Sequence, residues 1–258
     1  MTAPLDRRAW LRGALATTVS VLAAACDRVA GSPRVNSTLE GAETLTRSSH
    51  GLIVGRAALA REYPASAISP DFRANGTTNP DSEAYQALAS GQFRDWRLEI
   101  GGLVDTPLSL SLADLQAAPA RSQITRHDCV EGWSSIAQWR GARLGPLLQR
   151  ARLKPQARYI AFFCADALEL TLDGTGDYYE TIAVADAFHP QTILAYEMNG
   201  RPLPVAHGAP IRLRLERQLG YKMAKYVMRI EAIADFSKLG RGKGGYWEDR
   251  GYQWYAGI

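Results

Sequence analysis

The sequence predicts an α+β fold, with one domain in which short helices accompany a mixed β-sheet. Three observations support this prediction. The chain has 258 residues, of which 46% are apolar and 22% charged, as in globular domains. Runs with helical periodicity and runs with strand alternation follow one another in no fixed order, which argues against a helix bundle and against a doubly wound nucleotide-binding fold. No internal repeat interrupts residues 63–258, which we assign to this single domain.

The first 26 residues have the pattern of an export signal. A charged start containing Arg7 and Arg8 is followed by an apolar stretch and then by small residues before Cys26. The two arginines predict the twin-arginine pathway, which exports folded proteins to the periplasm, although paired arginines also occur in ordinary signals. Cleavage near Cys26 is favoured over acylation of its thiol, which would anchor the protein to a membrane. Residues 27–62 have the Ser, Gly and Arg content of a linker.

The first half of the domain contains two helix signals and one clear strand. A helix is expected over residues 82–90, ended by Gly91, and a strand follows where Trp96, Leu98 and Ile100 alternate with polar residues. Ser111 and Asp114 have the spacing of a capping box, which predicts a helix over residues 112–118. Further elements are expected as a strand ending near residue 130, a helix over 145–152 and a buried strand over 157–166.

The second half of the domain is expected to be mostly extended. Asn199 and Gly200 predict a tight turn between two extended runs, and a last strand is expected over residues 225–233, with Tyr226, Met228 and Ile230 on one side. In the strand over 210–217, Arg212 and Arg214 share the face opposite the aliphatic residues. Such a charged face is most often solvated, so solvent exposure is the expectation from this strand alone.

The last 19 residues combine several glycines with five aromatic residues. The glycines make the backbone permissive, whereas rings such as Tyr246, Trp247, Tyr252 and Trp254 require burial. The rings either complete the core of the domain or form a funnel or docking face, and the pattern favours the core.

Charge and cysteine content limit the classes of partner. The net charge is +4, with 26 acidic residues spread along the chain, so no nucleic-acid partner is expected. All but five of the 30 basic residues are arginines, which suit anionic small ligands such as phosphate esters. Two cysteines, Cys129 and Cys164, remain in the domain. They form a disulfide, or at least one is held as a metal-bound thiolate.

The common catalytic motifs of hydrolases, zinc proteases and nucleotide-binding proteins are missing from the sequence. His127 lies two residues before Cys129, so a Cys–His nucleophile is one reading of this segment. His127, Asp128 and Cys129 also resemble half of a metal site, but no second cluster has the spacing that zinc requires.

The segment around Cys129 contains two distinctive runs, Cys129-Val130-Glu131-Gly132-Trp133-Ser134 and Trp139-Arg140-Gly141. Together they resemble the molybdenum-ligand loop of the sulfite oxidase family of molybdopterin enzymes, especially its bacterial exported branch. Four further segments match in the same order, at residues 72–76, 187–204, 207–213 and 220–227. The resemblance covers residues 68–236 and implies the molybdopterin-binding fold of that family.

This resemblance implies a molybdenum-molybdopterin cofactor, with Cys129 as the protein ligand of the metal. It places Asn75, His207, Arg212 and the stretch Met223-Ala224-Lys225 in contact with the cofactor and Cys164 beside it. Arg126 and Arg140 flank the metal loop. Arg126 is a catalytic candidate, able to attract an anion or the oxygen of an S-oxide, although either arginine could equally be a surface residue in an ion pair.

The implied reaction is a two-electron oxygen-atom transfer. Reduction of an S- or N-oxide, free or protein-bound, is favoured over sulfite oxidation, because the loop sequence is similar to that of the periplasmic reductase branch. A metal-free secreted binding domain with a disulfide is the non-enzymatic alternative. Neither a haem domain nor an immunoglobulin-like domain is expected. Electrons therefore have to be exchanged with a separate protein, and we expect a membrane or periplasmic cytochrome.

Overall fold

The structure is a computed structural model that describes residues 58–171 and 176–258, together with residues 32, 41, 42, 45, 49 and 55. The predicted signal peptide, with Arg7, Arg8 and Cys26, lies outside the described residues. The chain divides into residues 1–55 and 56–258, and the second unit holds all the strands below. Within the described residues, no helix has both the length and the apolar character needed to cross a membrane.

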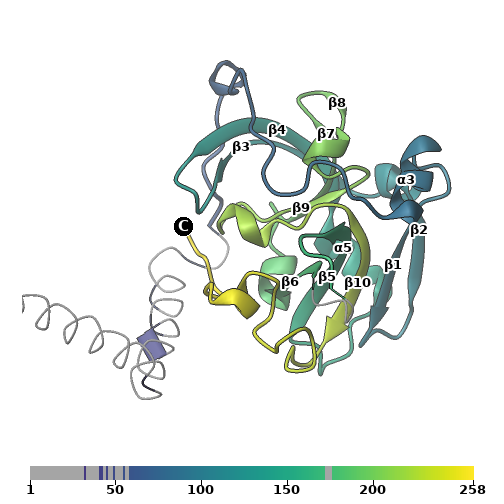
Figure 1. The fold of residues 1–258 in the computed structure, drawn as a ribbon, viewed down its shortest axis with the longest axis vertical. Helices are drawn as coiled ribbons and strands as arrows, with labels where there is room; N and C mark the ends of the chain where they lie inside the picture. The colour runs from purple at the N-terminus through teal and green to yellow at the C-terminus, as the bar shows by residue number, and fades with distance from the viewer. Residues whose placement is uncertain are drawn as a thin grey trace, which may run out of the picture. The chain divides into compact units, whose positions relative to one another are not determined.

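One mixed sheet forms the half of the domain drawn at the lower right in Figure 1. Its strand order is β2-β1-β10-β5-β6, and β1 runs parallel to β10 while the other neighbours are antiparallel. The parallel pair joins β1 and β10, the first and last strands of the domain, so the sheet is complete only when the whole domain has been assembled. Its strands are β1 (Arg97–Gly102), β2 (Leu108–Ser111), β5 (Tyr159–Ala167), β6 (Asp177–Ala183) and β10 (Val227–Ile233).

A second, antiparallel sheet contains the long β3–β4 hairpin seen at the top of Figure 1. It has the order β3-β4-β7-β8, and β9 pairs with β7. Residues before the hairpin lie along it, because Tyr63 donates to the carbonyl of Ile124 (2.9 Å) and Glu62 bridges to Thr125. The strands are β3 (Ala120–Asp128), β4 (Ser134–Arg143), β7 (Ile193–Met198), β8 (Arg201–Pro202) and β9 (Arg212–Arg214).

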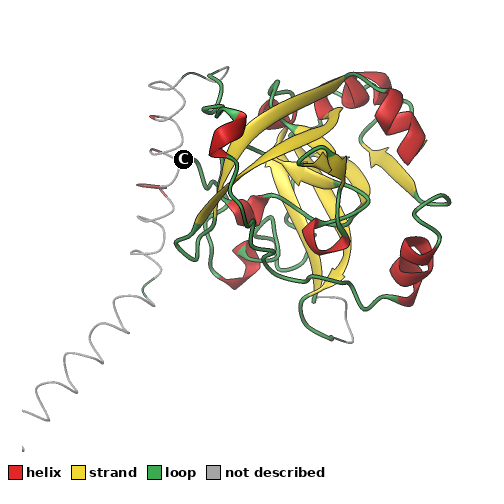
Figure 2. Ribbon diagram, turned by 90° about the horizontal axis from the view of Figure 1, so that it is seen from above, coloured by secondary structure: helices red, strands yellow, loops and turns green. Residues whose placement is uncertain are grey.

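The helices are short and lie at the periphery of the two sheets (Figure 2). They are η1 (Ala65–Ala67), α3 (Glu83–Ser90), α4 (Leu112–Ala117), α5 (Leu144–Ala151), α6 (Val184–Ala187), η2 (Val205–His207), η3 (Gly220–Lys222) and η4 (Glu248–Arg250). Their start signals match the sequence analysis. Ser82 caps α3, which ends at Gly91, and both hydrogen bonds of the Ser111–Asp114 capping box are present at α4.

Two apolar clusters lie under these elements. The larger contains the alternating residues Trp96, Leu98 and Ile100 of the first strand region, all at most 1% exposed. The smaller surrounds Trp139 and includes Phe72, next to the predicted functional loop. The alternation that predicted β1 is therefore confirmed by burial.

Two expectations about strand faces are wrong. Arg212 and Arg214 on β9 are buried, not solvated, because their guanidinium groups lie over the ring of Trp139 at 5.2 and 4.4 Å from its centroid. In β10, Tyr226 has a φ of 58° and lies outside the strand, and the register shifts between Val227 and Arg229. The buried face of this strand is accordingly that of Ile230 and Ala232.

Candidate active site

A cavity of about 380 Å³ is lined by residues of both sheets and of the C-terminal segment. Its walls comprise a segment before α3, the loop after β3, the end of β5, the residues around β9 and η3, and the region around η4. Of the predicted site residues, the structure brings Asn75, Cys129, His207, Arg212, Met223 and Lys225 together in this cavity.

Cys129 is held in a tight turn directly after β3. Its N–H donates to the carbonyl of Trp133 (2.9 Å), and the N–H of Gly132 donates to the carbonyl of Cys129 (3.0 Å). Gly132 has a φ of 86°, a conformation that favours glycine, which explains its place in the motif. The thiol is buried, and its Sγ accepts a hydrogen bond from the amide of Asn75 (3.1 Å).

Two basic side chains of the cavity have backbone carbonyls, not carboxylates, as their hydrogen-bond partners. Arg212 donates to the carbonyls of His207 (3.1 Å) and Met223 (3.4 Å), and its Nε has no partner among the described residues. Lys225 donates to the carbonyls of Asn75 (2.6 Å) and Thr77 (2.5 Å). We refer to Arg212, Lys225 and His207 as the basic cluster.

Burial and mutual repulsion lower the pKa of every member of the basic cluster. The pKa of Arg212 falls to about 9, through burial first and then Arg214. The pKa of Lys225 falls to about 7, through burial and Arg212, against the attraction of Asp166. The pKa of His207 falls to about 4, through burial and the two cations. The cluster thus favours a bound anion, which would lower the cost of these buried charges.

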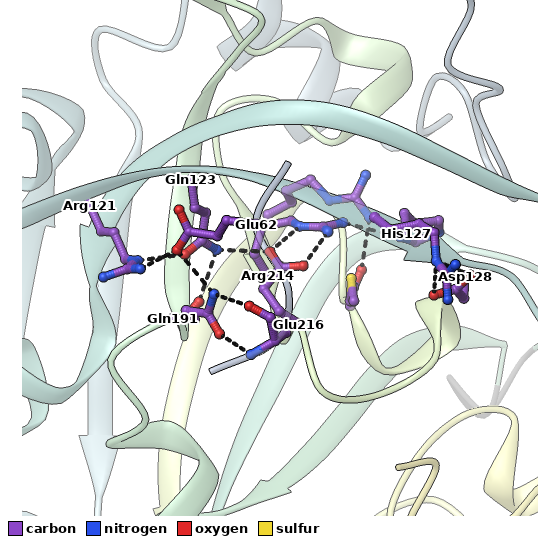
Figure 3. A network of polar contacts seen from close by, with 12 residues as sticks. Glu62, Arg121, Gln123, His127, Asp128, Gln191, Arg214 and Glu216 are labelled. Atoms are coloured by element: carbon purple, nitrogen blue, oxygen red, sulfur yellow. Dashed lines mark hydrogen bonds and ion pairs between the residues drawn. The ribbon is translucent and has the colours of Figure 1, made fainter. Parts of the chain in front are cut away.

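A buried polar network supports the cavity from the side of β3 (Figure 3). Arg214 forms a bidentate ion pair with Glu216 (2.9 and 2.6 Å) and donates to Nδ1 of His127 (3.1 Å). Gln123 extends the network by donating to Glu216 (2.8 Å) and to the carbonyl of Gln191 (3.1 Å).

This network argues against a Cys–His nucleophile. An arginine only donates, so Nδ1 of His127 is an acceptor and its proton lies on Nε2. Burial, Arg214 and Arg212 lower the pKa of His127 well below its ordinary value. His127 is therefore neutral, and Sγ of Cys129 receives its hydrogen bond from Asn75 instead.

Three predicted residues do not line the cavity. Arg126 points to the other face of β3 from His127, is half exposed and pairs with Asp128 (2.9 Å), so the structure does not bring this catalytic candidate to the cavity. Ala224 is buried between two lining residues, Met223 and Lys225. Cys164 lies on β5. Burial of its thiol first, and then the charge of Asp166, raise its pKa well above its ordinary value.

The cysteines decide between two alternatives that the sequence left open. Cys129 and Cys164 are both free thiols, so the disulfide is not formed. In the described part of the chain, no three His, Cys, Asp or Glu side chains are grouped as a metal site.

Sequence reasoning missed an aromatic wall of the cavity. Tyr221, Tyr246, Trp247 and Tyr252 line it together with Tyr178. Three of these five rings come from the last 19 residues, which the sequence favoured as core. Tyr246 does belong to the apolar core, and it also lines the cavity with Trp247 and Tyr252. The abundance of rings in this segment was the available signal.

Comparison with known proteins assigns the chain to a family. The family model described as "Oxidoreductase molybdopterin binding domain" matches residues 86–239. The chain belongs to this family. The match includes Cys129, the basic cluster and β1 to β10, so the mixed two-sheet domain is the molybdopterin-binding domain that the sequence predicted.

Several relatives in the family are similar to this chain over most of the domain. A putative protein-methionine-sulfoxide reductase subunit of Azospira oryzae is 38% identical over 199 residues, covering 77% of this chain and 68% of the relative. The protein-methionine-sulfoxide reductase catalytic subunit of Xanthomonas axonopodis pv. citri is 34% identical, covering 63% and 52%. That of Campylobacter jejuni is 33% identical, covering 54% and 49%. The chain thus spans about two thirds of the first relative and about half of the other two.

Among solved structures, the sulfane dehydrogenase SoxCD of Paracoccus pantotrophus matches with a TM-score of 0.49 and 23% identity. The match covers 55% of this chain and 39% of that chain.

The residues of the cavity fit the cofactor of the family. Molybdopterin carries a phosphate, and the unpartnered Nε of Arg212 is a buried donor suited to an anion. The soft sulfur that a molybdenum centre requires is available at Cys129, which lines the same cavity.

Proposed function

We propose that this chain is an exported molybdenum-molybdopterin enzyme that reduces an organic S-oxide, or a related N-oxide, by two-electron oxygen-atom transfer. The observation that carries the proposal is the buried thiol of Cys129 in one cavity with the basic cluster, of which Arg212 and Lys225 have backbone carbonyls as partners. That arrangement has little value for stability, because buried cations without carboxylates are costly.

Each residue of the proposed site has a distinct task. The cofactor, when bound, would supply a reduced metal that can accept the oxygen atom and give two electrons to the sulfur. Cys129 holds the metal through its thiolate, and the amide of Asn75 donates to this sulfur and fixes its direction. Arg212 and Lys225 bind the phosphate or ring edges of the pterin, and the Met223 to Lys225 stretch adds backbone groups.

The reaction balances as one S-oxide, two electrons and two protons giving one thioether and one water. The electrons come from a separate electron-transfer protein. For the substrate, the support is that the three relatives carry the name of protein-methionine-sulfoxide reductases, and that two of them are called catalytic subunits, which points to a partner subunit. A protein-bound methionine sulfoxide is therefore the first substrate to test.

The proposed location is the periplasm, reached through the twin-arginine pathway. It is supported by Arg7 and Arg8 before an apolar stretch. A protein whose cofactor is inserted during or after folding in the cytoplasm needs a route that carries folded chains. Fusion of residues 1–62 to a reporter, in cells with and without that pathway, tests the route.

Enzyme assays separate the proposed reaction from its alternatives. The purified holoprotein is given methionine sulfoxide with reduced viologen, and in parallel sulfite with cytochrome c. We expect viologen oxidation that depends on the sulfoxide and is lost in Cys129→Ser. Turnover of sulfite alone would show that the reaction is sulfite oxidation and not S-oxide reduction. A protein that is purified without metal from a host that makes the cofactor, and that is inactive in both assays, would favour a binding domain.

A further inference from the structure

The cavity is lined by two chemically different sets of residues. One is the basic cluster, and the other consists of the rings of Tyr221, Tyr246, Trp247 and Tyr252, which we call the aromatic wall. Trp247 stacks on Tyr252 (centroids 5.2 Å apart, planes at 27°), and Tyr221 meets Tyr252 edge to face at 5.2 Å. Arg212 is buried, whereas Tyr252 is 37% exposed and Trp247 is partly exposed. The stacked pair thus belongs to the mouth of the cavity.

The aromatic wall adjoins the loop that carries Cys129. Gly220 packs so closely on His127 that a Cβ there would lie 2.4 Å from Nε2 of the imidazole. Tyr221 follows directly and donates its hydroxyl to the carbonyl of Gln253 (2.6 Å), which joins η3 to the C-terminal segment. A molecule on the wall would therefore be near the sulfur-bearing turn.

Buried contacts hold the wall in place. Lys222, next to Tyr221, pairs with Glu180 of β6 and with Glu248 of η4, each at 2.5 Å, and all three side chains are at most 1% exposed. Tyr246 also donates its N–H to the carbonyl of Tyr179 (3.0 Å). These three side chains tie η3, β6 and the C-terminal segment together, so the rings are fixed before any ligand arrives.

We propose that the stacked pair Trp247 and Tyr252 is the specificity-determining surface of the enzyme and takes the apolar organic group of the S-oxide. The inference rests on the proposed function and narrows its substrate class to sulfoxides with an aryl or extended alkyl substituent. Inorganic oxyanions have no apolar group for such a surface.

Aromatic rings bind such sulfoxides through apolar contact and through sulfur–aromatic attraction. A ring offers a large apolar area with little loss of rotamer freedom, and a thioether or sulfoxide sulfur is attracted to its edge. Glu169 also lines the cavity and pairs with Arg250 (2.8 Å), so these two charges balance each other. The pair therefore adds no excess of positive charge that could attract a free oxyanion.

The test compares two substrates on the holoenzyme. Methyl phenyl sulfoxide carries an aryl group, whereas dimethyl sulfoxide has the same reacting group without it. For Trp247→Ala and Tyr252→Ala, we expect kcat/KM for methyl phenyl sulfoxide to fall about tenfold or more, mainly through KM, and that for dimethyl sulfoxide to change by less than about twofold. Phe236→Ala, which removes a ring that stacks on Trp254 outside the cavity, is the matched control and should leave both values unchanged.

Folding and cofactor loading are measured on the same samples. Trp247→Phe and Tyr252→Phe keep an apolar ring and should recover most of the lost kcat/KM, which a general loss of packing would not allow. Equal losses for both sulfoxides would overturn the inference. So would loss of pterin from both alanine variants, which would assign the rings to the cofactor.

Direct binding separates this inference from the proposed function. Calorimetric titration of the holoenzyme with methyl phenyl sulfoxide should give a Kd that weakens about tenfold in Trp247→Ala. Binding that weakens in this way without any turnover would support the surface and contradict S-oxide reduction. If the wild type reduces methionine sulfoxide but neither binds nor reduces methyl phenyl sulfoxide, the inference is wrong and the proposed function stands.

Discussion

At the scale of single residues, the two arginines of β9 have opposite electrostatic environments although only one residue separates them. Arg214 is paired with the carboxylate of Glu216 on two atoms, and neither side chain is exposed. Arg212 has carbonyl partners, an unpartnered Nε and a pKa lowered to about 9 by burial. The charge of Arg214 is therefore paired within the fold, whereas that of Arg212 is not, and we propose that Arg212 binds the cofactor.

Replacing each arginine by methionine tests this difference. In cofactor-free protein, Arg214→Met should cost about 3–5 kcal/mol, because it leaves Glu216 buried without a countercharge. Arg212→Met should cost less than about 1.5 kcal/mol, because only hydrogen bonds to carbonyls are lost. Urea unfolding measures both values. In protein made with the cofactor, Arg212→Met should lower the pterin content, and equal stability losses in the two variants would contradict the assignment.

Lys225 gives the cofactor-free protein a stability that depends on pH. Its pKa in the folded chain is lowered to about 7, so the folded state releases this proton near pH 7 whereas the unfolded chain keeps it to higher pH. The unfolded state then binds more protons, and stability rises with pH above 7. We expect the unfolding free energy to increase between pH 7 and 9, and this increase to disappear in Lys225→Met.

The cofactor-loaded protein is the control for this prediction. A bound phosphate would keep Lys225 charged, so the rise between pH 7 and 9 should be smaller when the cofactor is present. A rise of equal size in Lys225→Met would show that another group titrates in this range.

At the scale of elements, the close pairing of the antiparallel strands β4 and β7 explains the glycine of the Trp139-Arg140-Gly141 motif. A Cβ at Gly141 would lie 2.2 Å from the carbonyl oxygen of Leu194, at the point where the register of the two strands shifts. This close approach keeps β7 beside Trp139, whose ring supports both arginines of β9.

Gly141→Ala is expected to destabilise the domain by about 3 kcal/mol, at the upper end of the cost of overpacking, because backbone cannot move aside as a side chain can. Gly101→Ala in β1 is the matched control. No atom lies within 4 Å of its Cβ position, so its effect should be small. Thermal unfolding of the two variants measures the difference, and similar melting temperatures would refute the packing argument.

The elements that the sequence predicted well are those with local signals. Ser82 and Gly91 bound α3, and the Ser111–Asp114 capping box starts α4, because caps satisfy backbone groups within a few residues. The face of β9 was predicted wrongly for the opposite reason. Its burial depends on Trp139 and Glu216, which alternation within one strand does not reveal.

At the scale of the whole molecule, the site is assembled from segments far apart in the sequence. The motif resemblance placed Asn75, Cys129, His207 and Lys225 in one cavity, as the structure shows. It carried no information about the aromatic wall, whose position depends on the buried contacts of Lys222 with Glu180 and Glu248. Arg126 lies outside this cavity in an exposed ion pair with Asp128, which is the surface alternative that the sequence left open, because nearness in sequence does not decide the face of β3 from which a side chain points.

The most direct test of this account is the molybdenum and pterin content of the protein purified from a host that makes the cofactor. We expect one molybdenum and one pterin per chain, with an electron paramagnetic resonance signal of the metal on partial reduction. In Cys129→Ser the metal signal should be lost or altered, while Phe236→Ala retains it. A folded wild-type protein free of both molybdenum and pterin, isolated from that host, would contradict the account.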